Sequence, residues 1–307
     1  MKKIFKITLI GDSISQGSGA DSTSGMKMPY SYILKSLYSF LLFKYFKCKL
    51  FLSKLFFGKV KYQCLKKYKY ENYDIFRSEQ NSAFLTNKKW GIQYKIKNHI
   101  KQEIQMKHVT KTGLTYSTLN NREDSILKNE TDLLIVVLGA NDFFLNISVE
   151  EFTKNIEKFF KKLVFHNHYK IVLITGLVDF LPMFNSDPET IMTYTPFCNK
   201  AITRKNVLLN VSGGIADDLN ILYPAPQENI ETFMTKNKLF NEIIKKYSLL
   251  LGQSNAFKGK VLFLDINNEF KRIKNIDDFL AMDGLHLNKK GQKWIADTFF
   301  SALEGFI

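Results

Sequence analysis

The stretch Ile7-Thr8-Leu9-Ile10-Gly11-Asp12-Ser13 decides the fold, because a short apolar run leads directly into a turn that carries a hydroxyl group. A run of this length, ended by glycine, is typical of a strand buried inside a sheet. Similar apolar runs occur at residues 133–138, 171–175 and 261–265, with helical stretches between them. Buried strands that alternate with helices indicate a parallel sheet covered on both faces.

The same periodicity predicts the individual elements. The strands are expected at residues 5–10, about 106–110, 132–138, 170–176 and 260–265. The helices are expected near residues 30–43, 115–128, 149–163, 229–250 and 289–303. Ser148 and Asn288 stand directly before two of these helices, where a side-chain oxygen can accept the free N–H groups of the first turn. The apolar faces expected to point inward are Phe152, Ile156, Phe159 and Leu163 in one helix, and Trp294, Ile295, Phe299 and Leu303 in the other.

Three short blocks coincide with the ends of predicted strands or with the start of a helix. Gly11-Asp12-Ser13 follows the first strand, Gly139-Ala140-Asn141-Asp142 follows the strand at 132–138, and Asp283-Gly284-Leu285-His286 precedes the last helix. In an open parallel sheet, ligands bind beyond the carboxyl ends of the strands. The blocks therefore predict a site at that edge of the sheet.

The residue types in these blocks suit acyl transfer by a serine. A serine hydroxyl becomes a strong nucleophile when an imidazole takes its proton and a carboxylate orients the imidazole. Ser13, His286 and Asp283 can fill these three roles. A backbone N–H beside a glycine and an Asn amide can stabilise the oxyanion of the intermediate. Gly113 and Asn141 are the candidates, with the N–H of Ser13 as a third donor.

These blocks, in this order, resemble the SGNH (GDSL-type) hydrolase family of esterases and lipases, and the resemblance spans nearly the whole chain. It implies a three-layer α/β/α sandwich with a flavodoxin-like parallel sheet of about five strands. It also implies that Ser13 is the nucleophile, His286 the base, Asp283 the group that orients it, and Gly113 and Asn141 oxyanion donors. The chain departs from the family in two places. An Asn that often shortly precedes the glycine is replaced by the sequence Val109-Thr110-Lys111-Thr112, and Leu287 stands where relatives commonly have Pro.

The domain organisation follows from where the site residues lie in the chain. Ser13 and His286 are at opposite ends of the 307 residues, so one continuous sheet must bring them together. We therefore expect a single domain over residues 1–307, with two elaborations that could border the cleft. The first, about 44–95, is basic and aromatic. The second, about 181–228, holds five of the six prolines and is expected to be largely loop, with room for a short helix.

The basic segment accounts for much of the net charge of +15. Between Asp21 and Glu71 there is no acidic residue, and lysines alternate with Phe and Tyr. The lysines interrupt this segment too often for it to form a membrane-spanning helix.

Three interpretations of the segment stay open. It could be a lid with solvated lysines, or residues 35–70 could contact an anionic membrane surface. It could also bind nucleic acid, which the low arginine count and the lack of a known motif disfavour.

The remaining composition bears on compartment and cofactors. Lys6 interrupts the apolar N-terminal stretch, and cleavage of a signal peptide would remove Ser13, so we expect a cytoplasmic protein, peripheral at the membrane if the basic segment binds it. The three cysteines are odd in number and lack Cys-x-x-Cys spacing, which predicts neither a disulfide framework nor a zinc ribbon. His166 and His168 are interpreted as part of a polar connection. We expect no metal and no organic cofactor.

The sequence as a whole predicts hydrolysis of a carboxylic ester through an acyl-enzyme on Ser13. The basic aromatic segment favours a lipid or lysophospholipid ester, while the resemblance also allows a carbohydrate O-acetylesterase. Acyl transfer to an alcohol would use the same residues. A non-catalytic membrane-surface binding protein on the same fold is the alternative from another class, and it is disfavoured because no catalytic part is missing.

Overall fold

The structure is a computed structural model, and it describes residues 4–12, 15, 88–110, 113–121, 127–128, 130–179, 191–194, 201–203, 227–280 and 286–307. Several predictions from the sequence lie outside these residues. They concern the helix at 30–43, most of the basic segment at 44–95, the membrane-contact range at 35–70, and Ser13 and Asp283.

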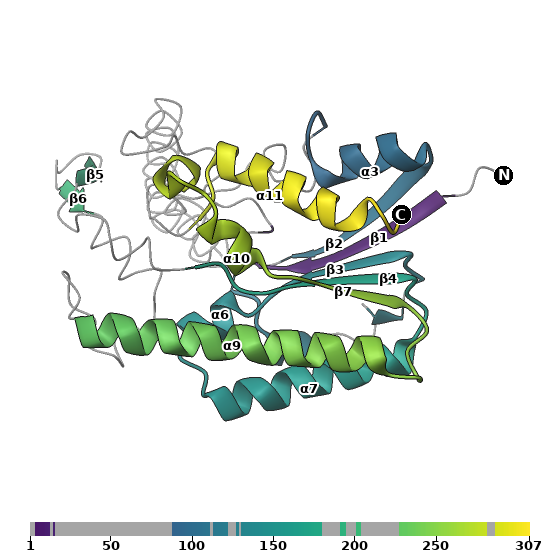
Figure 1. The fold of residues 1–307 in the computed structure, drawn as a ribbon, viewed down its shortest axis with the longest axis horizontal. Helices are drawn as coiled ribbons and strands as arrows, with labels where there is room; N and C mark the ends of the chain where they lie inside the picture. The colour runs from purple at the N-terminus through teal and green to yellow at the C-terminus, as the bar shows by residue number, and fades with distance from the viewer. Residues whose placement is uncertain are drawn as a thin grey trace, which may run out of the picture.

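Five parallel strands form one sheet in the order β2-β1-β3-β4-β7 (Figure 1). The strands are β1 (Ile4–Gly11), β2 (Glu103–Thr110), β3 (Leu133–Val137), β4 (Ile171–Thr175) and β7 (Lys260–Leu264). Each begins and ends within three residues of its predicted bounds. Counted along the chain, the order is that of the flavodoxin-like fold, with the first strand between the second and the third. The predicted fold class is confirmed.

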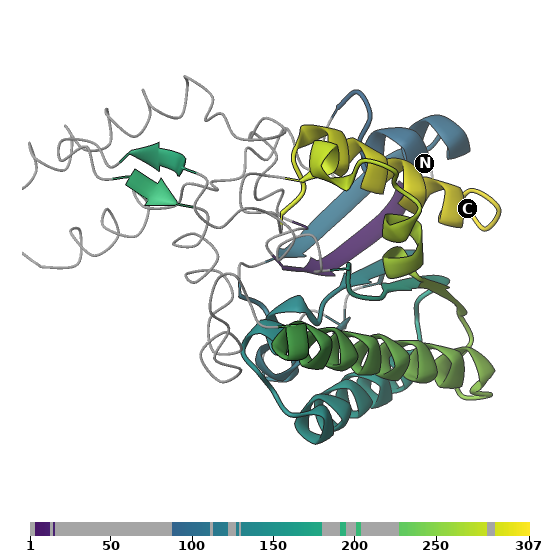
Figure 2. The ribbon, with the colours of Figure 1, turned by 60° about the vertical axis from the view of Figure 1, so that its left-hand side comes forward.

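Helices cover both faces of this sheet (Figures 1 and 2). One face carries α3 (Ile92–Ile100) and α11 (Lys289–Leu303), which contact each other, together with the short α10 (Ile266–Lys271) and η2 (Ile276–Phe279). The other face carries α7 (Val149–His166) and α9 (Gln227–Gln253), with the short α4 (Tyr116–Asn120) and α6 (Ala140–Phe144) beside them. The molecule therefore has the three layers expected from the sequence.

The two predicted helix caps are present. The Ser148 hydroxyl accepts a hydrogen bond from the N–H of Glu151, 3.1 Å away, at the start of α7. The Asn288 side chain accepts from Lys290 and Gly291 at the start of α11. The predicted inward faces are confirmed as well, since every member is buried except Trp294, which is partly buried.

Some elements differ from the sequence prediction. Within the predicted helix at 115–128, α4 ends at Asn120 and a turn follows at Asn121, whereas Leu127 is helical and residues 122–126 lie outside the described residues. The helices α3, α6 and α10 were not expected, and α3 begins inside the range assigned to the basic segment. The segment at 181–228, expected to be loop, contains an antiparallel pair, β5 (Ile191–Tyr194) with β6 (Ala201–Thr203). Its prolines flank these short strands and do not interrupt them, which is where prolines are compatible with strands.

The layer of α7 and α9 is fixed by aromatic packing. The rings of Phe152 on α7 and Phe240 on α9 stack with centroids 3.8 Å apart and an interplanar angle of 7°. Both side chains are fully buried. Tyr116 of α4 packs edge-on against Phe152 and Phe159, with centroids 5.8 and 5.5 Å away. The aromatic cluster therefore joins three helices into one layer.

Phe240→Ala should lower the free energy of unfolding by about 3–5 kcal/mol, because it opens a cavity between α7 and α9. The neighbouring Leu239 is 39% exposed, so Leu239→Ala should cost less than about 1 kcal/mol. Urea denaturation of both variants measures the difference. Equal losses would contradict the packing described here.

Candidate active site

The carboxyl ends of β1, β2 and β3 lie side by side. Gly11, the last residue of β1, pairs with Thr110 of β2 on one side and with Val137 of β3 on the other. The segments that leave these strands carry Asp12 and Ser13, Gly113, and Asn141 respectively. Two of the predicted blocks and the candidate Gly113 thus follow neighbouring strand ends at one edge of the sheet, as expected for parallel strands.

Asn141 and the segment that starts at Gly113 are joined directly. The Asn141 side-chain nitrogen donates a hydrogen bond to the backbone oxygen of Leu114, 3.1 Å away. An amide nitrogen carries two hydrogens, so this bond occupies one of them and fixes the plane of the amide. Gly113 has a φ of 76°, in the left-handed region that favours glycine. The structure therefore brings together two of the predicted oxyanion donors.

Gly139 makes the abrupt turn from β3 into α6 possible. Its φ is 114°, and a Cβ atom at this position would lie 2.9 Å from the Cδ2 atom of Leu177. Both the backbone conformation and the close contact require glycine. Because the turn is this tight, Asn141 lies in the first turn of α6, directly above the end of β3.

Asp142, next to Asn141, has a role that the sequence did not reveal. Its side chain is fully buried, and both carboxylate oxygens accept from the backbone N–H of Tyr116, at 3.2 and 3.1 Å. The pKa of Asp142 is raised to about 7, mainly because burial disfavours the charged carboxylate. The hydrogen bond from Tyr116 lowers the pKa in part, whereas the negative charges of Asp12 and Glu151 raise it further. A signal was present in the sequence, since this carboxylate stands directly before Phe143 and Phe144, shortly after a buried strand.

His286 is buried at the entry to α11, with only 7% of its surface exposed. The next residue, Leu287, pairs with Leu280 in an isolated antiparallel bridge. Asn288 then donates from its side chain to the backbone oxygens of Asp278 and Leu280, both at 2.9 Å. Leu287 is itself buried in the core, so pairing and burial hold this segment where relatives commonly have a proline.

A small cavity of about 20 Å³ lies below the strand ends. It is lined by Asp12, Thr175, Ile266, Ile295 and other, mainly apolar, residues. This volume is sufficient for about one water molecule. It belongs to the packing below the site and is too small to hold a substrate.

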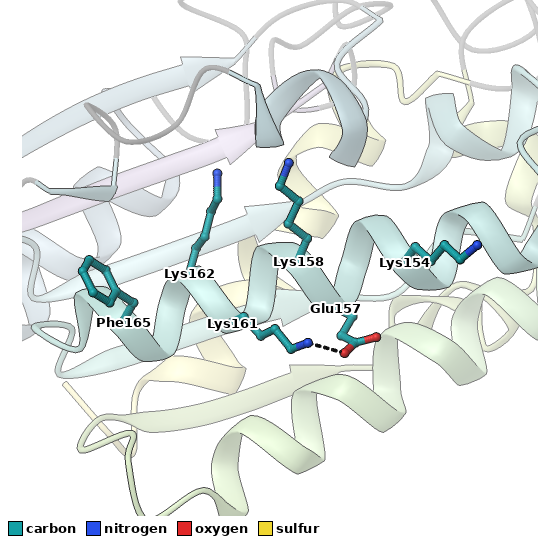
Figure 3. A pocket seen from close by; sticks show the side chains of 6 residues that line it. All are labelled: Lys154, Glu157, Lys158, Lys161, Lys162 and Phe165. Carbon is teal, nitrogen blue, oxygen red and sulfur yellow. Dashed lines mark ion pairs between the residues drawn. The ribbon is translucent and has the colours of Figure 1, made fainter.

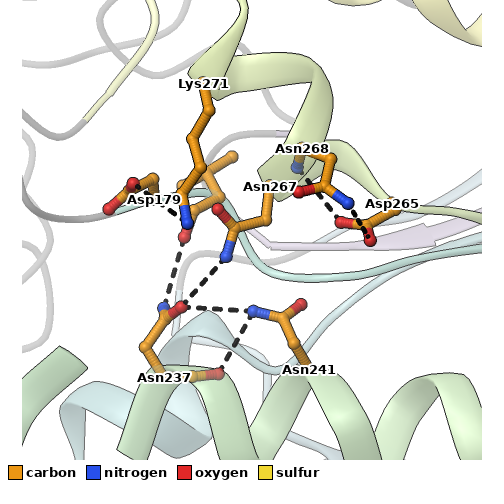
Figure 4. Close-up of polar contacts among 8 residues, drawn as sticks. Asp179, Asn237, Asn241, Asp265, Asn267, Asn268 and Lys271 are labelled. Atoms are coloured by element: carbon orange, nitrogen blue, oxygen red, sulfur yellow. Dashed lines mark hydrogen bonds and ion pairs between the residues drawn. The ribbon is translucent and has the colours of Figure 1, made fainter. Parts of the chain in front are cut away.

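The segment after β4 is held at the same edge by side-chain amides (Figure 4). Asn241 of α9 accepts from the N–H of Leu177 at 2.7 Å, and Asn237 donates to the backbone oxygen of Val178 at 3.2 Å. Asn267 of α10 donates to the Asn237 side chain at 3.4 Å. Helix α9 therefore holds this segment, and α10 is joined to α9 beside it.

A second hollow lies on the outer side of α7 (Figure 3). Lys161 forms an ion pair with Glu157 at 2.6 Å, and Lys154 pairs with Glu150 at 2.7 Å. The residues that line it are Lys154, Glu157, Lys158, Lys161, Lys162 and Phe165. They lie opposite the buried face of α7 and include none of the predicted site residues, so this hollow is not the candidate active site.

None of the helices in the described ranges is long and apolar enough to cross a membrane. Within the same part of the chain, no three His, Cys, Asp or Glu side chains come together as possible metal ligands.

Comparisons with known proteins find one matching family model and several structures of similar fold. The family model described as GDSL-like Lipase/Acylhydrolase matches residues 7–299. The structure of LAE5, an alpha/beta hydrolase enzyme from the metagenome of Lake Arreo, Spain, is similar with a TM-score of 0.51 at 12% identity, over 98% of this chain and 95% of that one. At this identity the similarity shows a shared fold.

Two other solved structures are similar over comparable lengths. The psychrotrophic esterase EstA from Pseudoalteromonas sp. is 14% identical, with a TM-score of 0.49 over 98% of this chain and 97% of that one. Axe2, an acetylxylan esterase from Geobacillus stearothermophilus, is 12% identical, with a TM-score of 0.49 over 100% and 98%. A search of curated proteins finds no match.

The burial of Asp142 predicts a pH-dependent stability. Its pKa is raised in the folded protein from 3.8 to about 7, so the folded state holds this proton more tightly than the unfolded state does. The stabilisation is present below pH 4 and is lost as the pH rises through 7, by about 1.4 kcal/mol for each unit by which the pKa is raised. The difference in unfolding free energy between the wild type and Asp142→Asn should therefore fall between pH 4 and pH 8.

Glu150→Gln is the matched control for this measurement. Glu150 is exposed, and its pKa is lowered by its hydrogen bond and ion pair with Lys154, so its contribution should change with pH in the opposite direction. A difference between wild type and Asp142→Asn that is constant with pH would contradict the buried, titrating carboxyl group.

Proposed function

The chain belongs to the GDSL-like lipase/acylhydrolase family, and from this membership we propose that it hydrolyses a carboxylic ester through an acyl-enzyme on Ser13. One observation carries the proposal. The segments after β1, β2 and β3 start side by side at one edge of the sheet, and the Asn141 amide donates a hydrogen bond to the backbone oxygen of Leu114, next to Gly113. This is the arrangement that an oxyanion-binding site needs, because its donors must be fixed before charge develops.

In the proposed reaction, the Ser13 hydroxyl attacks the ester carbonyl while His286 accepts its proton, and Asp283 orients the imidazole. The negative charge on the carbonyl oxygen is stabilised by the backbone N–H groups of Ser13 and Gly113 and by the Asn141 amide. Collapse of the intermediate expels the alcohol, which takes the proton from His286. A water molecule then attacks the acyl-enzyme with His286 as base, and the acid is released.

Turnover of p-nitrophenyl esters by the wild type, Ser13→Ala and His286→Ala tests this mechanism. Each variant should lose at least about 10³-fold in kcat, the scale of catalytic-triad knockouts. Ser15→Ala is the matched control, because Ser15 is a second serine in the same segment, and its buried hydroxyl has no hydrogen-bond partner among the described residues. It should keep wild-type turnover.

The outcomes separate the alternatives. Wild-type activity in Ser13→Ala would reject the proposed nucleophile. A wild type that is folded but turns over no ester would instead support a non-catalytic binding protein.

For the substrate we propose a lipid or lysophospholipid ester, supported by the basic aromatic residues at 35–70. This predicts that kcat/KM for p-nitrophenyl esters rises with acyl length from acetate to octanoate, because each buried methylene group favours binding by about 0.8 kcal/mol. Preference for acetate would support a carbohydrate O-acetylesterase. Product analysis with an added acceptor alcohol distinguishes hydrolysis from acyl transfer.

A further inference from the structure

We propose that Asp142 is a positioning residue, whose carboxylate holds the segment from Gly113 to Tyr116 against α6 and so aims the oxyanion donors of Gly113 and Asn141. The inference rests on the proposed function. It assigns a role to Asp142, a member of the Gly139-Ala140-Asn141-Asp142 block that the reaction itself does not use.

Two consecutive side chains of α6 hold the segment at two points. Asn141 donates to the backbone oxygen of Leu114 at 3.1 Å, and Asp142 accepts from the backbone N–H of Tyr116 at 3.1 and 3.2 Å. The two points are separated by a single residue, and one is an acceptor while the other is a donor. A segment held in this way can neither slide along α6 nor rotate away from it, and Gly113 is directly next to the first point.

The far side of the segment is fixed by α4. The Thr115 hydroxyl accepts from the N–H of Thr118 at 3.0 Å and so caps this helix. The Tyr116 ring is fully buried, with its edge against Phe152 and Phe159 of α7. The contact of Asp142 with Tyr116 N–H therefore connects α6 to a helix that is itself packed in the core.

A carboxylate in this place needs a reason, because burying a charged group is costly unless hydrogen bonds compensate it. Asp142 is fully buried, and the N–H of Tyr116 donates to both of its oxygens. This N–H is shared between the two oxygens and compensates part of the cost of burial. The contact attaches α6 to the glycine segment, where a misplacement of about 1 Å can reduce the rate on the order of 10²-fold.

The test is a double-mutant cycle on kcat with Asp142→Ala, Asn141→Ala and both together. Asn141→Ala should lose about 10²–10³-fold, as for other oxyanion donors. Asp142→Ala should lose between about 10-fold and about 100-fold in kcat, with KM changed by less than about 2-fold, because a misaimed donor affects mainly the transition state. The double variant should lose less than the product of the two single losses, because the two side chains hold the same segment.

Asn120→Ala is the matched structural control. Asn120 ends α4 and donates from its side chain to the backbone oxygen of Asn155 at 2.8 Å, so its removal loosens the same helix at the end away from Gly113. Measured at a temperature where circular dichroism shows every variant folded, it should keep kcat within about 2-fold.

Two further variants keep the test decisive if Asp142→Ala does not fold. Asp142→Asn retains an acceptor oxygen and should restore most of kcat, whereas Asp142→Leu fills the space without an acceptor and should lose as much as Ala.

The inference is overturned if Asp142→Ala and Asp142→Leu keep wild-type kcat, if the two single losses multiply, or if Asn120→Ala loses as much as Asp142→Ala. A wild type without any esterase activity would overturn the proposed function, and this role with it.

Discussion

Gly11 pairs with Thr110 and with Val137, so β1, β2 and β3 end side by side at one edge of the sheet. Each segment that leaves this edge carries part of the candidate site, and each begins from a strand whose position the backbone ladder fixes. β3 is buried along its whole length, which leaves its end no freedom to move independently of its neighbours. The sheet edge thus determines where the polar groups can meet.

Beyond that edge, where the backbone hydrogen bonds between strands end, side-chain hydrogen bonds hold the connecting segments. Asn141 and Asp142 join the segment after β3 to the segment after β2, Asn237 and Asn241 hold the segment after β4, and Asn288 holds the segment that contains His286. Each bond contributes on the order of 1 kcal/mol to stability. Their larger effect is geometric, because every one of them fixes a short connection relative to a helix that is packed in the core.

The sequence allowed much of this arrangement to be predicted. Apolar runs located β1, β3, β4 and β7, and Ser148 and Asn288 located the starts of α7 and α11. β2 was also predicted, although polar residues interrupt its apolar positions. The helices α6 and α10 were missed because five or six residues are too few to show a helical period. The convergence of Gly113 and Asn141 followed from the rule that parallel strands end at one edge.

The contact between Asp142 and Tyr116 joins residues 26 apart in the chain, and it depends on how α4 packs against α6. No local pattern encodes such a contact. The catalytic roles of Ser13, Asp283, His286, Gly113 and Asn141 all stay predictions, and Ser13 and Asp283 also lie outside the described residues.

Covalent labelling tests the central claim most directly. The wild type would be incubated with a p-nitrophenyl alkylphosphonate, in which the attacking serine displaces nitrophenolate, and the adduct would be located by mass spectrometry of peptides. The proposed mechanism predicts a single adduct on Ser13 that forms far more slowly in His286→Ala. An adduct on a different residue that accompanies full loss of activity would contradict it.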